Sequence, residues 1–137
     1  MPQVARVGVS LEPDLLRKFD ERRKAKKYGN RSEAIRDLIR EDLVKDEWQD
    51  NKEIAGAITL IYDHHKRALV NKLMDIQHDF GNMIISSQHI HLDHNNCLEV
   101  IAVKGSPKKA QELADSLKSV KGVKHGTISM STTGKGM

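Results

Sequence analysis

The sequence of 137 residues has one cysteine, few aromatic residues and no long apolar run. Cys97 cannot form an intrachain disulfide, so it is expected to be a free thiol or a metal ligand in a reducing, cytoplasmic setting. Aromatic residues make up only 4% of the chain, so any core must be aliphatic. No apolar stretch reaches the roughly 18–20 residues of a membrane span, and the N-terminus has no signal-peptide segment. We therefore expect no membrane association.

Charged residues make up 31% of the sequence and hydrophobic residues 38%, a balance typical of globular rather than disordered chains. The formal net charge is +4. This excess of positive charge favours an acidic partner, although only mildly.

Residues 5–11 alternate between apolar and polar side chains, which predicts a β-strand. One face carries Val7, Val9 and Leu11, and the other carries Arg6, Gly8 and Ser10. Two helices are expected to follow: one begins at Pro13, and the second is capped by Asn30 with Glu33 three residues later.

A lone strand leaves its backbone groups unpaired, so this segment needs a second chain. The same strand from a partner would complete an antiparallel ribbon above four helices. A two-stranded ribbon fits the major groove of DNA, where Arg6 and Ser10 could contact base edges and Gly8 would lie between them. The amides at the start of the second helix, around Arg31 and Ser32, could hold a phosphate. The alternative is that Arg6 and Ser10 only solvate an exposed face, and that the lysines of this segment only keep the protein soluble.

Taken as a whole, the sequence predicts an α+β fold in two domains. The first comprises residues 1–47, with a strand and two helices, and the second comprises residues 54–132. A linker at 48–53 joins them, and residues 133–137 form a tail. The second domain is expected to be a ferredoxin-like βαββαβ unit. Its strands are predicted at 54–62, 83–92, 97–104 and 123–131, and its helices at 65–80 and 106–121.

His89 and His91 share one face of the second strand of this domain, because residues i and i+2 of a strand project together. A turn over residues 93–96 would bring Cys97 up beside them on the next strand. Two imidazoles and a thiolate form a transition-metal site in outline. Glu99, on the face of Cys97, could hold a histidine N–H.

His78 is the natural fourth ligand, because it lies off the apolar stripe of its helix. We expect the helices to cover the sheet face of Leu98 and Val100, opposite the metal ligands. On that arrangement His78 would have to come from another subunit. The other histidines (His64, His65, His94 and His125) are expected to be ordinary surface or structural residues.

The donor set suits Ni(II), Cu(II) or Zn(II), and affinity alone does not choose among them. A small-molecule-binding regulator is the alternative from another class, since ferredoxin-like regulatory domains often bind ligands between subunits. An enzyme is not expected, because four ligands leave no open position for a substrate.

Arg6–Leu11 together with Asn30–Asp37 resembles the ribbon–helix–helix DNA-binding family. Over nearly its whole length the chain resembles the nickel-responsive repressor (NikR) family, whose domains are ribbon–helix–helix and ACT/ferredoxin-like. The motifs that carry this second resemblance are Tyr62–Arg67, Gln77-His78, His89–His91, Asn95–Glu99 and Gly122–Gly126.

The resemblance implies a cytoplasmic repressor that binds double-stranded operator DNA as a homotetramer, a dimer of dimers. It implies one Ni(II) per subunit, held in a square plane by His89, His91 and Cys97 of one chain and His78 of another. It also implies an ion site that involves Glu33 and Asp37. Gly8 departs from the larger polar residue that many members carry, which leaves the operator sequence open.

Overall fold

The computed structural model describes residues 3–137 and divides into two compact units, one ending at Glu41 and the other comprising Asp42–Met137. None of the helices within residues 3–137 is long and apolar enough to cross a membrane. The α+β fold class expected from the sequence is confirmed.

The first unit contains α1 (Pro13–Ala25) and most of α2 (Arg31–Gln49). Pro13 occupies the first turn of α1, where its missing N–H costs nothing. The Asn30 side chain accepts a hydrogen bond from the Glu33 amide at 2.9 Å, which confirms the predicted cap of α2. Glu33 in turn accepts from the Gly29 amide at 3.3 Å.

The predicted strand at residues 5–11 is absent from this single chain, and residues 3–12 run without helix or strand. The reason is physical: a strand is defined by its ladder, and this segment has no partner strand within its own chain. Its apolar face is bare, with Val7 85% exposed and Val9 66% exposed. The missing partner is what a two-chain ribbon would supply.

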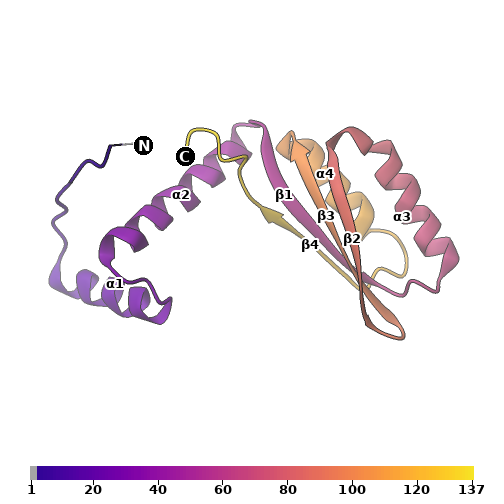
Figure 1. Cartoon of the computed structure of the whole chain (residues 1–137), viewed down its shortest axis with the longest axis horizontal. Helices are drawn as coiled ribbons and strands as arrows, with labels where there is room; N and C mark the ends of the chain where they lie inside the picture. Colours follow the sequence, from indigo (N-terminus) through magenta and orange to yellow (C-terminus); the bar gives the residue numbers. More distant parts are fainter. Residues whose placement is uncertain (1–2) are drawn as a thin grey trace. The chain divides into compact units, whose positions relative to one another are not determined.

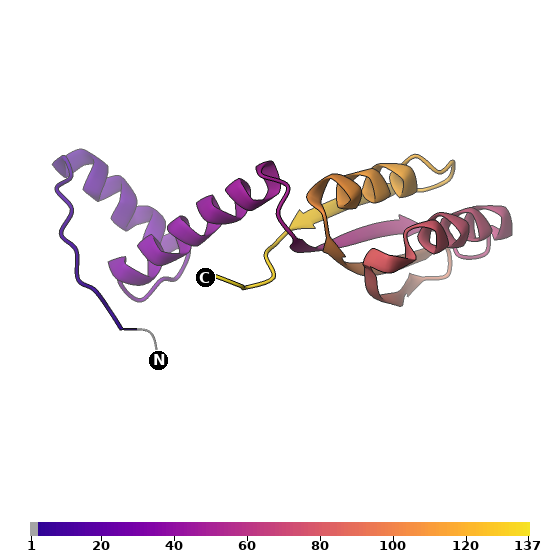
Figure 2. The same cartoon turned by 90° about the horizontal axis from the view of Figure 1, so that it is seen from above.

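The second unit contains β1 (Ile54–Tyr62), α3 (Arg67–Asp79), a 3-10 turn η1 (Gly81–Met83), β2 (Ile84–Asp93), β3 (Asn96–Gly105), α4 (Pro107–Lys118) and β4 (His125–Met130). The strands form one antiparallel sheet in the order β2-β3-β1-β4 (Figure 1). This is the predicted ferredoxin-like arrangement. Seen from above, α3 and α4 lie on the same side of the sheet (Figure 2).

The core lies between the sheet and these two helices. It is mostly aliphatic, as the composition predicts, although it also includes Tyr62; Ile58, Ile101 and Leu113 have no exposed surface. Cys97 and Glu99 lie on the same, helix-covered face, at 1% and 2% exposure. The prediction that Leu98 and Val100 lie under the helices is therefore wrong. Leu98 and Val100 on one face compete with Ile101 and Val103 on the other, and it is Ile101 and Val103 that have no exposed surface.

The ends of the second unit differ from expectation in detail. Helix α2 continues through Gln49, so the predicted linker begins inside a helix. The residues after β4 contact this helix end: the Trp48 indole N–H donates to the Ser131 carbonyl at 2.8 Å, and the Thr132 hydroxyl donates to Glu47 at 3.3 Å.

Candidate metal centre and nucleic-acid interface

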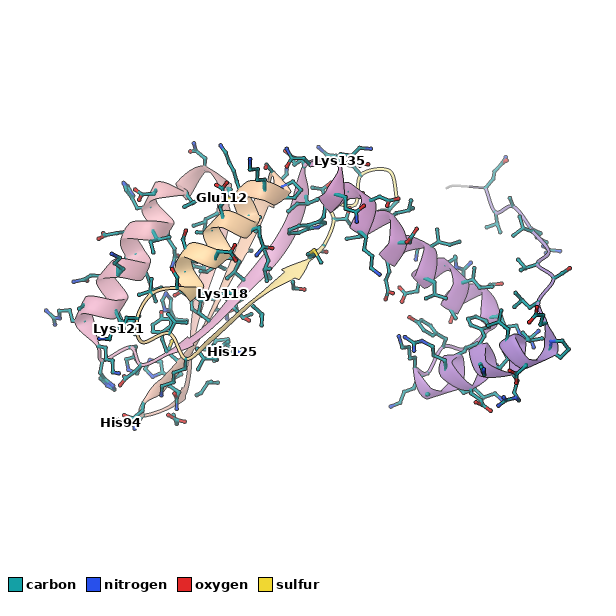
Figure 3. The ribbon with its side chains drawn as sticks, turned by 180° about the vertical axis from the view of Figure 1, so that it is seen from behind. His94, Glu112, Lys118, Lys121, His125 and Lys135 are labelled. Atoms are coloured by element: carbon teal, nitrogen blue, oxygen red, sulfur yellow. The ribbon has the colours of Figure 1, made fainter. Side chains whose placement is uncertain are left out.

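The β2–β3 hairpin sets the predicted ligands in register on adjacent strands. His91 pairs with Cys97, and His89 pairs with Glu99, so all four lie on one face of the sheet. The turn that joins the strands is fixed by Asp93, which accepts hydrogen bonds from the Asn95 amide and the Asn96 side chain, each at 2.9 Å. His94 lies at the tip of this hairpin, well away from the core (Figure 3).

A shared face does not by itself assemble a metal site. The structure contains one group of three His, Cys, Asp or Glu donor atoms that lie within 4.8 Å of one another among residues 3–137, and it is Asp63, His64 and His65. The predicted trio of His89, His91 and Cys97 is therefore aligned but not drawn together in the single chain.

Glu99 is a hydrogen-bonding centre beneath these ligands. Its Oε1 accepts from the Tyr62 hydroxyl at 2.7 Å, and its Oε2 accepts from Ser87 at 2.6 Å and from Gln77 at 3.1 Å. His89 Nε2 lies 3.5 Å from the same Oε2. The carboxylate is thus placed to orient the His89 ring, as predicted for a partner of a metal ligand.

Sequence reasoning missed the donors that hold this carboxylate. Tyr62 and Gln77 belong to β1 and α3, so no local spacing connects them with Glu99. Ser87 could have been found from its alternation with His89 on β2. Burial raises the pKa of Tyr62, and the hydrogen bond to Glu99 raises it further.

Burial also raises the pKa of the Cys97 thiol, with a contribution from the Glu99 charge. In this surrounding the neutral thiol is favoured, whereas a bound cation would favour the thiolate. A buried thiol beside two imidazoles fits a thiophilic, borderline metal ion and not a hard ion such as Mg²⁺.

His78 lies on α3 and lines an open cavity of about 440 Å³ that is also lined by His89, Gln77 and Glu99. Because α3 covers the face that carries the ligands, the expected obstacle to His78 within one chain does not exist. The sequence argument for a partner-derived His78 is therefore wrong in its premise.

Three of the histidines predicted to have only a surface or structural role, His64, His65 and His94, lie close to another histidine ring. The His64 ring centroid lies 4.0 Å from that of His65 and 4.4 Å from that of His91. His65 lies 4.9 Å from His94 by the same measure. Burial, followed by the neighbouring His65 and His91, lowers the pKa of His64.

The residues predicted to contact DNA lie in the first unit and are exposed. A Cβ added to Gly8 would meet nothing within 4 Å. Arg31 is engaged within the unit, since its Nε and Nη2 donate to the Asp20 carboxylate at 3.0 and 2.8 Å. This ion pair lowers the pKa of Asp20 to about 2.

The two acidic residues of the predicted ion site each have a local donor. Asp37 accepts from the Tyr28 hydroxyl, and Glu33 accepts from the Gly29 amide. Each carboxylate is therefore held in place on α2 by its own unit.

An extended N-terminal segment and two helices that lack a partner chain, joined to a ferredoxin-like domain with imidazoles and a thiol on one face, are the features of a metal-responsive DNA-binding regulator. Residues 5–46 match the model of the ribbon–helix–helix proteins of the copG family, and residues 55–131 match the model of the NikR C-terminal nickel-binding domain. The chain belongs to the NikR family.

Relatives are similar over nearly the full length. A protein of Syntrophus aciditrophicus named as a candidate nickel-responsive regulator is 57% identical over 135 residues, which cover 98% of each chain. One of the same name from Chlorobium limicola is 53% identical, covering 98% of this chain and 100% of its own. An uncharacterized protein of Thermotoga maritima shares the fold over 56% of this chain, with a TM-score of 0.51 at 13% identity.

Proposed function

We propose that this chain is a nickel-responsive transcriptional repressor that binds operator DNA when Ni(II) is bound. The observation that carries the proposal is the common face of His89, His91, Cys97 and Glu99, within the part of the chain that matches a nickel-binding domain. The names of the relatives favour nickel over copper or zinc, and over a small-molecule effector. The family is one of transcriptional regulators, and the chain is not an enzyme.

His89, His91 and Cys97 would hold one Ni(II) per subunit, and His78 would be the fourth ligand. Glu99 would hold the Nε2–H of His89, and Nδ1, which lies 3.4 Å from the Tyr62 hydroxyl, would be the nitrogen that turns to the metal. A bound Ni(II) supplies positive charge and fixed ligand directions at the point where the hairpin meets α3. Within the chain, Asp93 fixes the hairpin turn and Glu99 orients the ring of His89.

The bare apolar face of Val7 and Val9 supports pairing of two chains through their N-terminal segments. Arg6, Gly8 and Ser10 would then face the major groove, while Arg31 and Ser32 would contact phosphates. Glu33 and Asp37 remain the proposed ion site. The whole assembly would be a homotetramer, a dimer of dimers, acting on the chromosome in the cytoplasm.

The proposal is tested by the binding of a genomic DNA fragment that the nickel-loaded protein selects. Nickel should raise the affinity by about 5–150-fold, the usual range of coupling between two sites. Cys97→Ala should abolish this increase and the nickel–thiolate absorbance band, whereas Glu112→Gln, on the surface of α4 (Figure 3), should leave both unchanged. Equal affinity with and without nickel would refute the proposal.

The origin of His78 is tested by mixing two inactive variants, His78→Ala and Cys97→Ala, in co-expressed assemblies. If His78 comes from the partner subunit, mixed pairs contain an intact ligand set and regain a nickel–thiolate band. If all four ligands come from one chain, every site lacks a ligand and no band returns.

A further inference from the structure

The chain that follows β4 returns to the end of α2 (Figure 1). We call residues 131–135 the strap. The Ser131 amide extends the ladder of β4, because it donates to the Ala55 carbonyl at 3.0 Å. The Ser131 carbonyl accepts from the Trp48 indole N–H at 2.8 Å. The strap therefore joins the first residues of β1 to the last turn of α2.

Thr132 makes the second contact between the strap and α2. Its hydroxyl donates to Glu47 Oε1 at 3.3 Å. The other carboxylate oxygen, Oε2, is buried and has no hydrogen-bond partner among residues 3–137. A buried carboxylate is unfavourable without donors, so the Thr132 hydroxyl matters more here than it would at an exposed acceptor. Lys135 lies 3.8 Å from Glu53 (Figure 3), but this pair is exposed and contributes little.

The end of α2 is held from other sides as well. The Trp48 ring packs against the core and lies over Gly56 of β1, where an added Cβ would be 3.5 Å from the ring. Beyond the helix, Asn51 Oδ1 accepts from the Ser106 hydroxyl at 3.1 Å, which ties the connection to the start of α4. The boundary between the two units accordingly falls inside α2. With the strap closed, the last turn of α2 is part of the second unit.

The strap itself is loosely held. Ser131 and residues 134–137 are exposed, and Thr132 is only partly buried. Segments with few buried apolar contacts and exposed hydrogen bonds open at a fraction of the free energy of global unfolding. The strap can therefore open while the core between the sheet and its helices stays folded.

We propose that the strap is a releasable clamp on the end of α2. When closed, it fixes the last turn of α2 to the sheet, and when open, it frees this turn from β4. Helix α2 is the covalent connection between the two units. A change at the nickel site therefore reaches the DNA-binding unit of the same chain along a path that the strap stiffens. This last step rests on the proposed function.

Trp48 is the chain's only tryptophan, so its fluorescence reports on the clamp directly. Thr132→Val removes the hydroxyl and keeps nearly the same shape. It should shift the Trp48 emission to longer wavelength and increase its quenching by acrylamide. Thr132→Ser keeps the hydroxyl and should behave as wild type. The matched control is Thr133→Val, which should change neither signal, since the Thr133 hydroxyl accepts from the Lys135 amide within the strap, at 3.5 Å.

The second readout is the ratio of DNA affinities with and without nickel. In Thr132→Val this ratio should fall several-fold towards one, with the nickel–thiolate band and the far-UV circular dichroism unchanged, whereas Thr133→Val should keep the wild-type ratio. The proposal is overturned if Trp48 is as protected in Thr132→Val as in wild type, or if an exposed Trp48 leaves the ratio unchanged. If the wild-type ratio is already one, the proposed function fails, and Trp48 fluorescence alone decides whether the strap clamps α2.

Discussion

The two units of the chain differ sharply in how much they bury. In the part of the first unit that the structure describes, Ala34 alone is buried, while Leu15, Ile35, Leu38 and Ile39 remain exposed. The second unit contains a continuous aliphatic core between its sheet and two helices. A single chain thus suffices to fold the metal-binding half, whereas the DNA-binding half lacks the apolar surface that it needs. The difference indicates that DNA binding depends on assembly.

The largest expected effect comes from placing a charge on the bare N-terminal face. Val9→Asp would bury a carboxylate in the proposed ribbon, a cost that pairing of two short segments cannot offset. DNA binding should be lost at all nickel concentrations in a gel-shift assay, while the nickel–thiolate band persists.

The matched control for this variant is Ser10→Ala, on the opposite side of the same segment. It should keep the assembly seen by sedimentation and weaken DNA binding only modestly. Wild-type DNA affinity in Val9→Asp would show that the first unit works without a second chain.

In the second unit, the largest loss of unfolding free energy should follow truncation of a core side chain. Leu113 on α4 has no exposed surface, and Leu113→Ala should lower the free energy of unfolding of this unit by about 2–5 kcal/mol. The loss should not depend on protein concentration if the core is complete within one chain.

Leu38→Ala is the comparison in the first unit, where this side chain is 46% exposed. Its cost should be small at low protein concentration and grow as chains associate. Urea unfolding at two concentrations measures both variants, and equal behaviour of the two would contradict the distinction between the units.

Gly56 in the second unit and Gly8 in the first differ in how closely other atoms pack against their backbone. A Cβ at Gly56 would lie 2.9 Å from the Ser129 carbonyl oxygen and 3.5 Å from the Trp48 ring, whereas one at Gly8 would meet nothing. Gly56→Ala should therefore cost about 1–3 kcal/mol, since strand β4 must shift. Gly8→Ala should leave stability nearly unchanged. Thermal unfolding of the two variants gives the difference directly.

The sequence predicted the order of elements in the second unit because its helices and strands have distinct apolar periods. It also placed His89, His91 and Cys97 on one face, since strand alternation and the turn at 93–96 decide that locally. It did not predict which face the helices cover. Strand β3 is apolar on both sides, with Leu98 and Val100 on one and Ile101 and Val103 on the other, and only tertiary packing chooses.

Contacts between distant segments were beyond sequence reasoning for the same reason. The hydrogen bonds of Tyr62 and Gln77 to Glu99 join β1 and α3 to β3, and no spacing along the chain encodes them. The gathering of His64 with Asp63 and His65 could have been suspected, because the three are consecutive. The ribbon strand was predicted from alternation, yet its formation requires another chain.

The smallest expected effect is a pH-dependent one in the first unit, where an ion pair joins α1 to α2. Arg31 holds the pKa of Asp20 at about 2 in the folded unit, below the ~3.9 of an unfolded chain. Between these values the unfolded state binds more protons, so the pair's contribution to stability is complete above about pH 4 and is lost as the pH falls through about 2.

Asp20→Asn should therefore lower the urea midpoint by a constant, small amount from pH 5 upward, and the difference from wild type should shrink below about pH 4. The effect is small because the Arg31 side of the pair is exposed to solvent and the interaction is screened by salt. Arg31→Met should reproduce only part of it, because Arg23 Nε also lies 3.5 Å from the Asp20 carboxylate, and the double variant should cost no more than Asp20→Asn alone. A difference that persists unchanged at low pH, or that is additive in the double variant, would mean that Asp20 stabilises α1 by a contact other than these two ion pairs.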